Sequence, residues 1–119
     1  MGVTQLYQPA GSNLCGQTCV AMLAGTSIEA VCHMLGKHGS TRTRDIVRAL
    51  RHYGYRAESR AKRLALGALP LGDGILNYHW SERRMGHWLL YINGHIYDPY
   101  FGPPSSTGRA TSYIAFSKR

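Results

Sequence analysis

Four side chains in two distant segments are of the types that a thiol hydrolase needs. Gln8 and Cys15 lie near the N-terminus, and His87 and Asp98 lie on either side of the dipeptide at residues 93–94. A cysteine nucleophile requires a neighbouring base, a group that orients this base, and a donor that stabilises the oxyanion. The chain supplies a glutamine, a cysteine, a histidine and an aspartate in that order, which indicates nucleophilic catalysis.

Cys15 is predicted to stand at the start of an apolar helix over residues 15–24, which Gly25 ends. The backbone N–H groups and the dipole at a helix start favour a thiolate. The Cys15 N–H and the Gln8 amide could both donate to an oxyanion. Gly16 carries no side chain, which we expect to let substrate approach the backbone. The alternative is that Cys15 is a small buried hydrophobe, as we expect for the two remaining cysteines, Cys19 and Cys32.

His87 opens a predicted strand over residues 87–92, and Asp98 ends a second one over residues 95–98. Asn93-Gly94 between them is a strong signal for a two-residue hairpin turn. The hairpin makes His87 and Asp98 cross-strand neighbours, so the carboxylate can hold one ring nitrogen while the other faces the thiol. His95 is a rival base that lies next to the turn. Gln5 is a rival to Gln8, and a surface amide is the alternative for Gln8.

The chemistry-bearing residues fall into an ordered set of short motifs. These are Gln8, the run Cys15-Gly16-x-x-Cys19-x-x-Met22, the run Gly86-His87-Trp88, and Asp98-Pro99. The set resembles the papain-like cysteine peptidases, in particular the branch that removes double-glycine leaders from bacteriocin precursors and its stand-alone bacterial and phage relatives. The resemblance implies that Cys15 is the nucleophile, His87 the base, Asp98 its orienter and Gln8 the oxyanion donor.

The same resemblance implies a protein or peptide substrate, cleaved at a peptide or isopeptide bond without a cofactor. Deamidation and acyl transfer by the same apparatus stay open, because one fold can host several reactions. A second hypothesis is a catalytically inactive papain-like module that binds a host or partner protein.

The hydrophobic pattern predicts an α+β fold in a single domain over residues 1–119. Helices are expected at 15–24, from a Thr26-x-x-Glu29 capping box to about residue 35, and from residues 40–43 to Gly54. The period then changes to that of strands, expected at residues 55–63, 74–80, 87–92, 95–98 and 111–117, with a further short strand at 3–7. The predicted architecture packs N-terminal helices on a C-terminal antiparallel sheet, as the papain-like resemblance also implies.

The chain is basic, with a formal net charge of +8, and eight of its Lys and Arg residues lie between residues 42 and 63. Arg44, Arg48 and Arg51 are predicted on the outer face of the third helix, where they could bind an acidic partner. A solvated helix face is the simpler interpretation. Nucleic-acid binding through this stretch is a further, less favoured alternative.

Three cysteines cannot all pair within one chain, so reduced thiols and a cytoplasmic protein, of the producing or host cell, are expected. Their spacing with His33 and His38 does not match the usual zinc patterns, and we predict no metal. The sequence shows no secretory signal and no apolar run of the roughly 18 residues that a membrane span needs. We therefore expect no membrane association, and a monomer.

Overall fold

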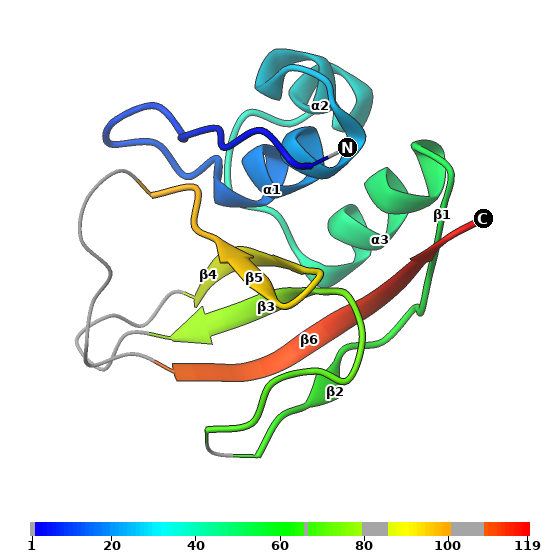
Figure 1. Ribbon diagram of the computed structural model, residues 1–119. Coiled ribbons are helices and arrows are strands. Elements are labelled where there is room, and N and C mark those ends of the chain that lie inside the picture. The colour runs from blue at the N-terminus through cyan, green and yellow to red at the C-terminus, as the bar shows by residue number, and fades with distance from the viewer. Residues whose placement is uncertain (1, 66, 80–85, 101–108) are drawn as a thin grey trace.

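The computed structural model describes residues 2–65, 67–79, 86–100 and 109–119, and in these ranges three helices pack on a six-stranded antiparallel sheet (Figure 1). The helices are α1 (Cys15–Ala24), α2 (Ile28–Leu35) and α3 (Thr43–His52). The strands are β1 (Tyr55–Ala57), β2 (Lys62–Arg63), β3 (Gly74–His79), β4 (Gly86–Ile92), β5 (His95–Tyr97) and β6 (Arg109–Lys118). The predicted α+β class, with helices first and strands after, is confirmed.

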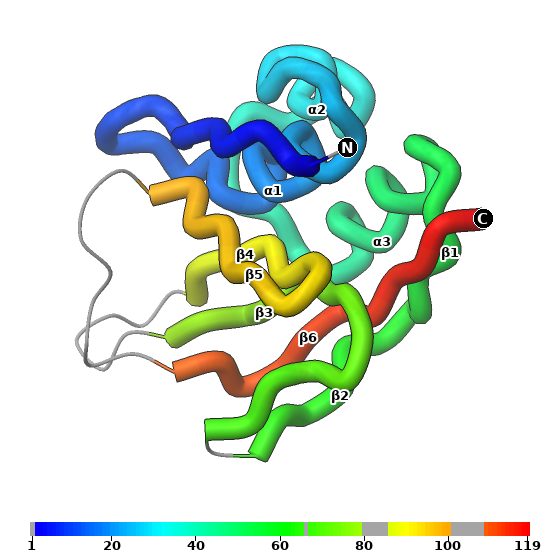
Figure 2. Tube along the Cα trace, viewed as in Figure 1, coloured from blue at the N-terminus to red at the C-terminus, as the bar shows by residue number. Residues whose placement is uncertain are grey.

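The strand order in the sheet is β1-β6-β3-β4-β5, and β2 pairs with a second stretch of β6. The last strand along the chain therefore lies inside the sheet, between β1 and β3, as the red end of the tube shows (Figure 2). All pairings are antiparallel. β4 lies next to the edge strand β5, and the helical layer covers β4 through α1.

Helix α1 is buried on almost all sides, because α2 and α3 flank it and β4 lies beneath it. It ends at Gly25, which has the left-handed backbone (φ 69°) that glycine adopts without a steric cost. The α3 side chains Ile46, Val47 and Leu50 face the same core, as their spacing predicts. No helix in the described ranges is long and apolar enough to span a membrane alone. The pair α1 and α2 passes that test only jointly, on length and composition, and is bent by 112°.

The β4–β5 hairpin turns at Asn93 and Gly94, which have φ values of 53° and 79°. Positive φ at both positions is the signature of a tight turn that matches the twist of the strands. Its register pairs Leu90 with Tyr97 and Ile92 with His95. Continued by one residue, this register places Asp98 diagonally across from His87 on the same side of the hairpin.

Three local expectations differ from the structure. Residues 3–7 form no strand, because Gln5 and Gln8 fasten this segment to residues 98 and 99 without a ladder. The strand expected over residues 55–63 is divided into β1 and β2, which pair with different stretches of β6. Helix α2 is capped by Ser27 rather than Thr26, since the Ala30 N–H donates to Ser27 Oγ at 3.0 Å. Trp80 and the loops expected at 81–85 and 101–107 lie outside the described residues.

Candidate active site

The core of the candidate site is a short contact between the His87 ring and Asp98. His87 Nε2 lies 2.6 Å from Asp98 Oδ1, and only 5% of the His87 side chain is exposed. Asp98 Oδ1 also accepts from the Tyr100 N–H at 2.8 Å, which fixes the carboxylate. The Tyr100 ring meets the His87 ring edge-on, with centroids 6.2 Å apart. The residues that directly follow β5 therefore hold the imidazole in one orientation.

The Cys15 thiol approaches the same ring from the start of α1. Burial by itself lowers the pKa of His87, but hydrogen bonds to Asp98 and Cys15 and the negative charges of both groups raise it to about 9. The ring is therefore an imidazolium near neutral pH. Because Nε2 is bonded to Asp98, Nδ1 is the ring nitrogen that can face the thiol. The structure brings Cys15, His87 and Asp98 together, in the arrangement that the sequence predicts.

Cys15 is half-buried, at the position where α1 begins. The residue before it, Leu14, has no side-chain acceptor with which to cap the helix. The first-turn amides of α1 therefore receive no side-chain cap from this residue, and the start of a helix is where a negative charge is stabilised. A partly exposed thiol at a helix start, beside an imidazolium, has the surroundings of a reactive cysteine.

The loop that contains Gln8 is attached to the same region. The Gln8 N–H donates to Pro99 O at 2.8 Å, and Gln8 Nε2 donates to Ser12 O at 2.8 Å. The Gln8 side chain is thus anchored within its own loop, and this loop is joined to the residue that follows Asp98. Gln8 Oε1 is buried and has no hydrogen-bond partner among the described residues.

Gln5, the rival to Gln8, is engaged elsewhere. Its Nε2 donates to Leu6 O at 2.7 Å and to Asp98 O at 2.9 Å, so both amide hydrogens already have acceptors. Gln5 therefore holds the backbone of Asp98 and is a positioning residue. Nothing in the sequence around it distinguishes this role, since the contact spans 93 residues.

The structure explains the glycine at position 16 differently from the sequence-based expectation. A Cβ added there would lie 2.1 Å from Thr41 Oγ1 and 3.1 Å from Trp88 Cδ1. The missing side chain thus lets α1 pack against β4 and the segment before α3. Gly16 itself is buried, so the expectation that it opens the backbone to substrate is wrong.

The two other cysteines are fully buried, as expected. The Cys19 thiol lies 3.4 Å from Trp88 O, and burial, with the nearby charges of Cys15 and Asp98, raises its pKa well above the ordinary value. A buried, protonated thiol of this kind is a poor nucleophile. His95 is exposed opposite Ile92, directly after the turn, and does not reach the site.

Two of the three arginines expected at a partner surface have structural contacts. Arg48 Nη2 donates to Leu35 O at 2.9 Å and joins α3 to the end of α2. Arg51 donates twice to Ala57 O, at 3.2 and 2.8 Å, and joins α3 to β1. Within the described ranges, no three His, Cys, Asp or Glu side chains are grouped to hold a metal ion.

Comparison with protein-family models and with curated protein sequences gives no match for this chain. The chain is therefore described here by its fold and by the geometry of its candidate site. It is an α+β domain in which a cysteine at a helix start meets a histidine and an aspartate from a β-hairpin.

Proposed function

We propose that this chain is a papain-like cysteine hydrolase that cleaves a peptide or isopeptide bond through Cys15, His87 and Asp98. One observation carries the proposal: the buried His87 ring is bonded to Asp98 and to Cys15 at once. A carboxylate–imidazole–thiol chain supplies the nucleophile, the base and the group that orients the base for covalent acyl transfer. The substrate would be a protein or peptide, and the reaction needs no cofactor.

The protonation state of His87 determines how the reaction would begin. With its pKa at about 9, the His87 ring carries its proton at neutral pH, and this positive charge favours the thiolate form of Cys15 as the attacking group. The thiolate attacks the substrate carbonyl carbon, and the new oxyanion accepts from the Cys15 N–H and, in the proposed role, from the Gln8 amide. His87 then gives its proton to the leaving amine, which departs as the carbonyl reforms in an acyl-enzyme.

The second half of the reaction reverses these roles. Neutral His87 takes a proton from water, the resulting hydroxide attacks the thioester, and the carboxylic acid product leaves as the thiolate is restored. Asp98 keeps the ring oriented throughout. If ammonia were the leaving group, or an amine replaced water, the same steps would give deamidation or acyl transfer.

The double-glycine leader-processing branch is the proposed family on the ordered motifs of Gln8, Cys15, His87 and Asp98. Binding of an acidic partner at Arg44, Arg48 and Arg51 is a separate proposal that rests on the net charge of +8. It is weakened by the use of Arg48 and Arg51 as links between elements.

The direct test is the alkylation rate of each thiol at pH 6, followed by peptide mass spectrometry. A thiolate paired with His87 should react at this pH well before the buried Cys19 and Cys32. His87→Ala should slow the labelling of Cys15, and His95→Ala on the same hairpin should not. Equal, slow labelling of all three thiols would instead favour an inactive module that binds a partner protein.

A second experiment measures the hydrolysis of peptide substrates. Wild-type protein should hydrolyse members of a fluorogenic peptide library, and Cys15→Ala should abolish this while leaving the folded state intact. A Cys15→Ala protein with full activity would refute the proposal.

A further inference from the structure

The connection between β2 and β3 exposes two leucine side chains to solvent. Leu71 is fully exposed and Leu69 is half exposed, whereas Pro70 between them is buried. We call residues 69–71 the leucine tip. Single exposed apolar residues are common on protein surfaces, but two that project from one short connection indicate a surface that contacts something apolar.

The backbone of this connection is fastened to the sheet at both ends. The Leu64 N–H donates to Thr111 O at 3.0 Å, directly after β2. At the other end, Asp73 Oδ1 accepts from the Asn93 N–H at 3.0 Å. The leucine tip is therefore presented by an anchored backbone, and little further ordering is needed to hold it at a surface.

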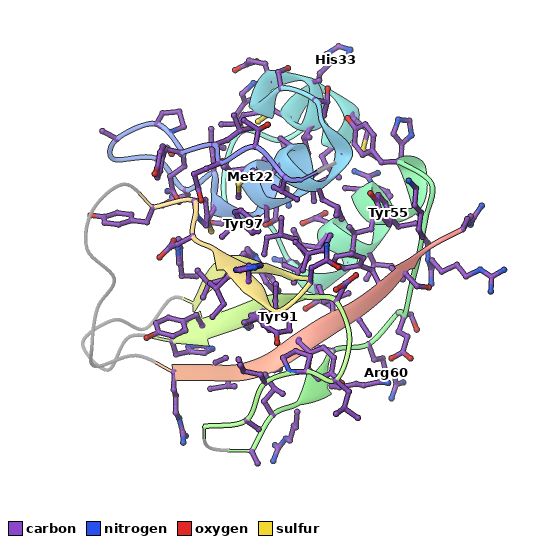
Figure 3. The ribbon with its side chains drawn as sticks, viewed as in Figure 1. Met22, His33, Tyr55, Arg60, Tyr91 and Tyr97 are labelled. Carbon is purple, nitrogen blue, oxygen red and sulfur yellow. The ribbon has the colours of Figure 1, made fainter. Side chains whose placement is uncertain are left out.

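A group of basic side chains precedes the leucine tip in the chain. All four are exposed, and they are Arg56, Arg60, Lys62 and Arg63. The one acid among residues 56–72 is Glu58, which pairs with Lys62 at 3.1 Å where both side chains are half exposed. Figure 3 shows Arg60 beside β2, at the opposite end of the molecule from α2. This end of the molecule is therefore positively charged next to the exposed leucines.

The composition of this region fits an anionic lipid surface better than a protein partner. Residues 58–73 include no aromatic side chain. The residues that dominate binding between proteins are enriched in Trp, Tyr and Arg, and leucine is under-represented among them. A lipid surface instead favours aliphatic side chains that reach the acyl boundary and basic side chains that stay at the anionic headgroups. The segment supplies both kinds of side chain in adjacent stretches.

We propose that the leucine tip and the basic side chains at residues 60–63 bind the surface of an anionic bilayer. Leu69 and Leu71 enter the boundary between headgroups and acyl chains, and the basic side chains pair with lipid phosphate and carboxylate groups. The expectation of no membrane association rested on the absence of a spanning segment, which a surface contact of this kind does not need. The contact includes none of the proposed catalytic residues and does not depend on the proposed hydrolase function.

The binding should respond both to lipid charge and to apolar area. Each basic side chain near an anionic surface should contribute a factor of about five to the partition of the protein onto vesicles. Each leucine that leaves water should contribute up to about tenfold. Because salt screens the attraction between charges, partition should fall when the salt concentration rises from about 0.05 M to about 0.5 M.

The experiment measures co-sedimentation of Cys15→Ala protein with vesicles of phosphatidylcholine, either alone or mixed with about 30% phosphatidylserine as the anionic lipid. The protein should sediment with the mixed vesicles and not with the neutral ones. Leu69→Ser and Leu71→Ser should each weaken this binding. Ile96→Ser on β5 is the matched control and should bind as before, because Ile96 is 50% exposed and Leu69 is 52% exposed.

A second pair of variants tests the charge. Arg63→Gln should weaken binding to the mixed vesicles about fivefold. Arg44→Gln removes an equal charge from an exposed side chain on α3 and should leave this binding unchanged. Because every substituted side chain is at least half exposed, all these variants should keep the circular dichroism spectrum of the folded protein.

Several outcomes would overturn the lipid contact. These are equal binding to mixed and neutral vesicles, equal losses in Leu69→Ser and Ile96→Ser, or no sedimentation with either kind of vesicle. In the last case, a dimer in solution that Leu71→Ser abolishes would assign the leucine tip to a contact between two copies of the chain. Because the protein tested has no Cys15 thiol, each outcome is independent of whether the chain is a hydrolase.

Discussion

Replacing Asp98 with asparagine should remove most of the pH dependence of stability that His87 confers. The pKa of His87 is raised from 6.5 to about 9 in the folded protein, and Asp98 Oδ1 lies 2.6 Å from its ring. Such a group stabilises the folded state fully below its unfolded pKa, and the contribution is lost as the pH rises through the folded pKa. The difference corresponds to roughly 3 kcal/mol, at 1.36 kcal/mol for each unit of pKa.

The contribution of His87 to the pH dependence of stability is best measured between pH 6.5 and 8. In a Cys15→Ala background, where no folded-state thiolate offsets this proton, the protein should lose up to roughly 1.5 kcal/mol of its free energy of unfolding there, because the folded state keeps a proton that the unfolded state releases. This window ends below the ordinary thiol pKa of about 8.5, so ionisation of cysteines in the unfolded chain contributes little. In Asp98→Asn, burial lowers the pKa of His87 without the opposing carboxylate. Most of the decrease in the free energy of unfolding between pH 6.5 and 8 should then be absent from this variant.

The assay is urea unfolding, followed by tryptophan fluorescence at both pH values, with an NMR titration of the His87 ring. Asp73→Asn is the matched control, because Asp73 accepts from the turn residue Asn93 and has no histidine partner in the described structure. In the same Cys15→Ala background, it should retain the full pH dependence. If Asp98→Asn kept the full loss, or if Asp73→Asn also abolished it, the carboxylate of Asp98 would not be what holds the proton on His87.

Three further substitutions test the packing around the site. Gly16→Ala should cost about 1–3 kcal/mol in urea unfolding, because its methyl group would collide with Thr41; an unchanged midpoint would mean that the segment before α3 adjusts freely. Cys19→Asn should cost at least about 2 kcal/mol by burying an unpaired amide, measured as a lowered thermal midpoint; a wild-type midpoint would contradict its full burial. Arg48→Gln should lower the free energy of unfolding by about 1 kcal/mol through the lost bond to α2 and should not change the alkylation rate of Cys15; a slower rate would connect α3 to the site.

The parts that could be predicted from the sequence are those set by local chemistry. Asn93-Gly94 specifies a two-residue turn, and the register that follows from it places Asp98 on the same side of the hairpin as His87. Gly25 specifies where α1 ends, and the apolar residues before it indicate a buried helix. Short-range rules thus located both halves of the candidate site.

The parts that could not be predicted depend on contacts between distant segments. Gln5 reaches Asp98 across 93 residues, so no neighbouring residue indicates its role. The segment at 3–7 resembles a strand by composition, but it is held at residues 98 and 99 by the Gln5 side chain and the Gln8 N–H rather than by a ladder of backbone bonds. Gly16 could be explained only once Thr41 and Trp88 were placed against it. In each case the tertiary partner, rather than the local propensity, decides the outcome.

The position of β6 between β1 and β3 has a consequence for the order in which the chain can fold. The helices that carry Cys15 can form from local contacts early in synthesis, but β1 and β3 have no common neighbour until residues 109–118 leave the ribosome. Pairings of such long sequence separation form slowly, because loop closure costs entropy before the contacts repay it. The nascent chain would therefore carry its thiol on a formed helix while two strand edges wait for their shared partner, and it is most exposed to aggregation in that interval.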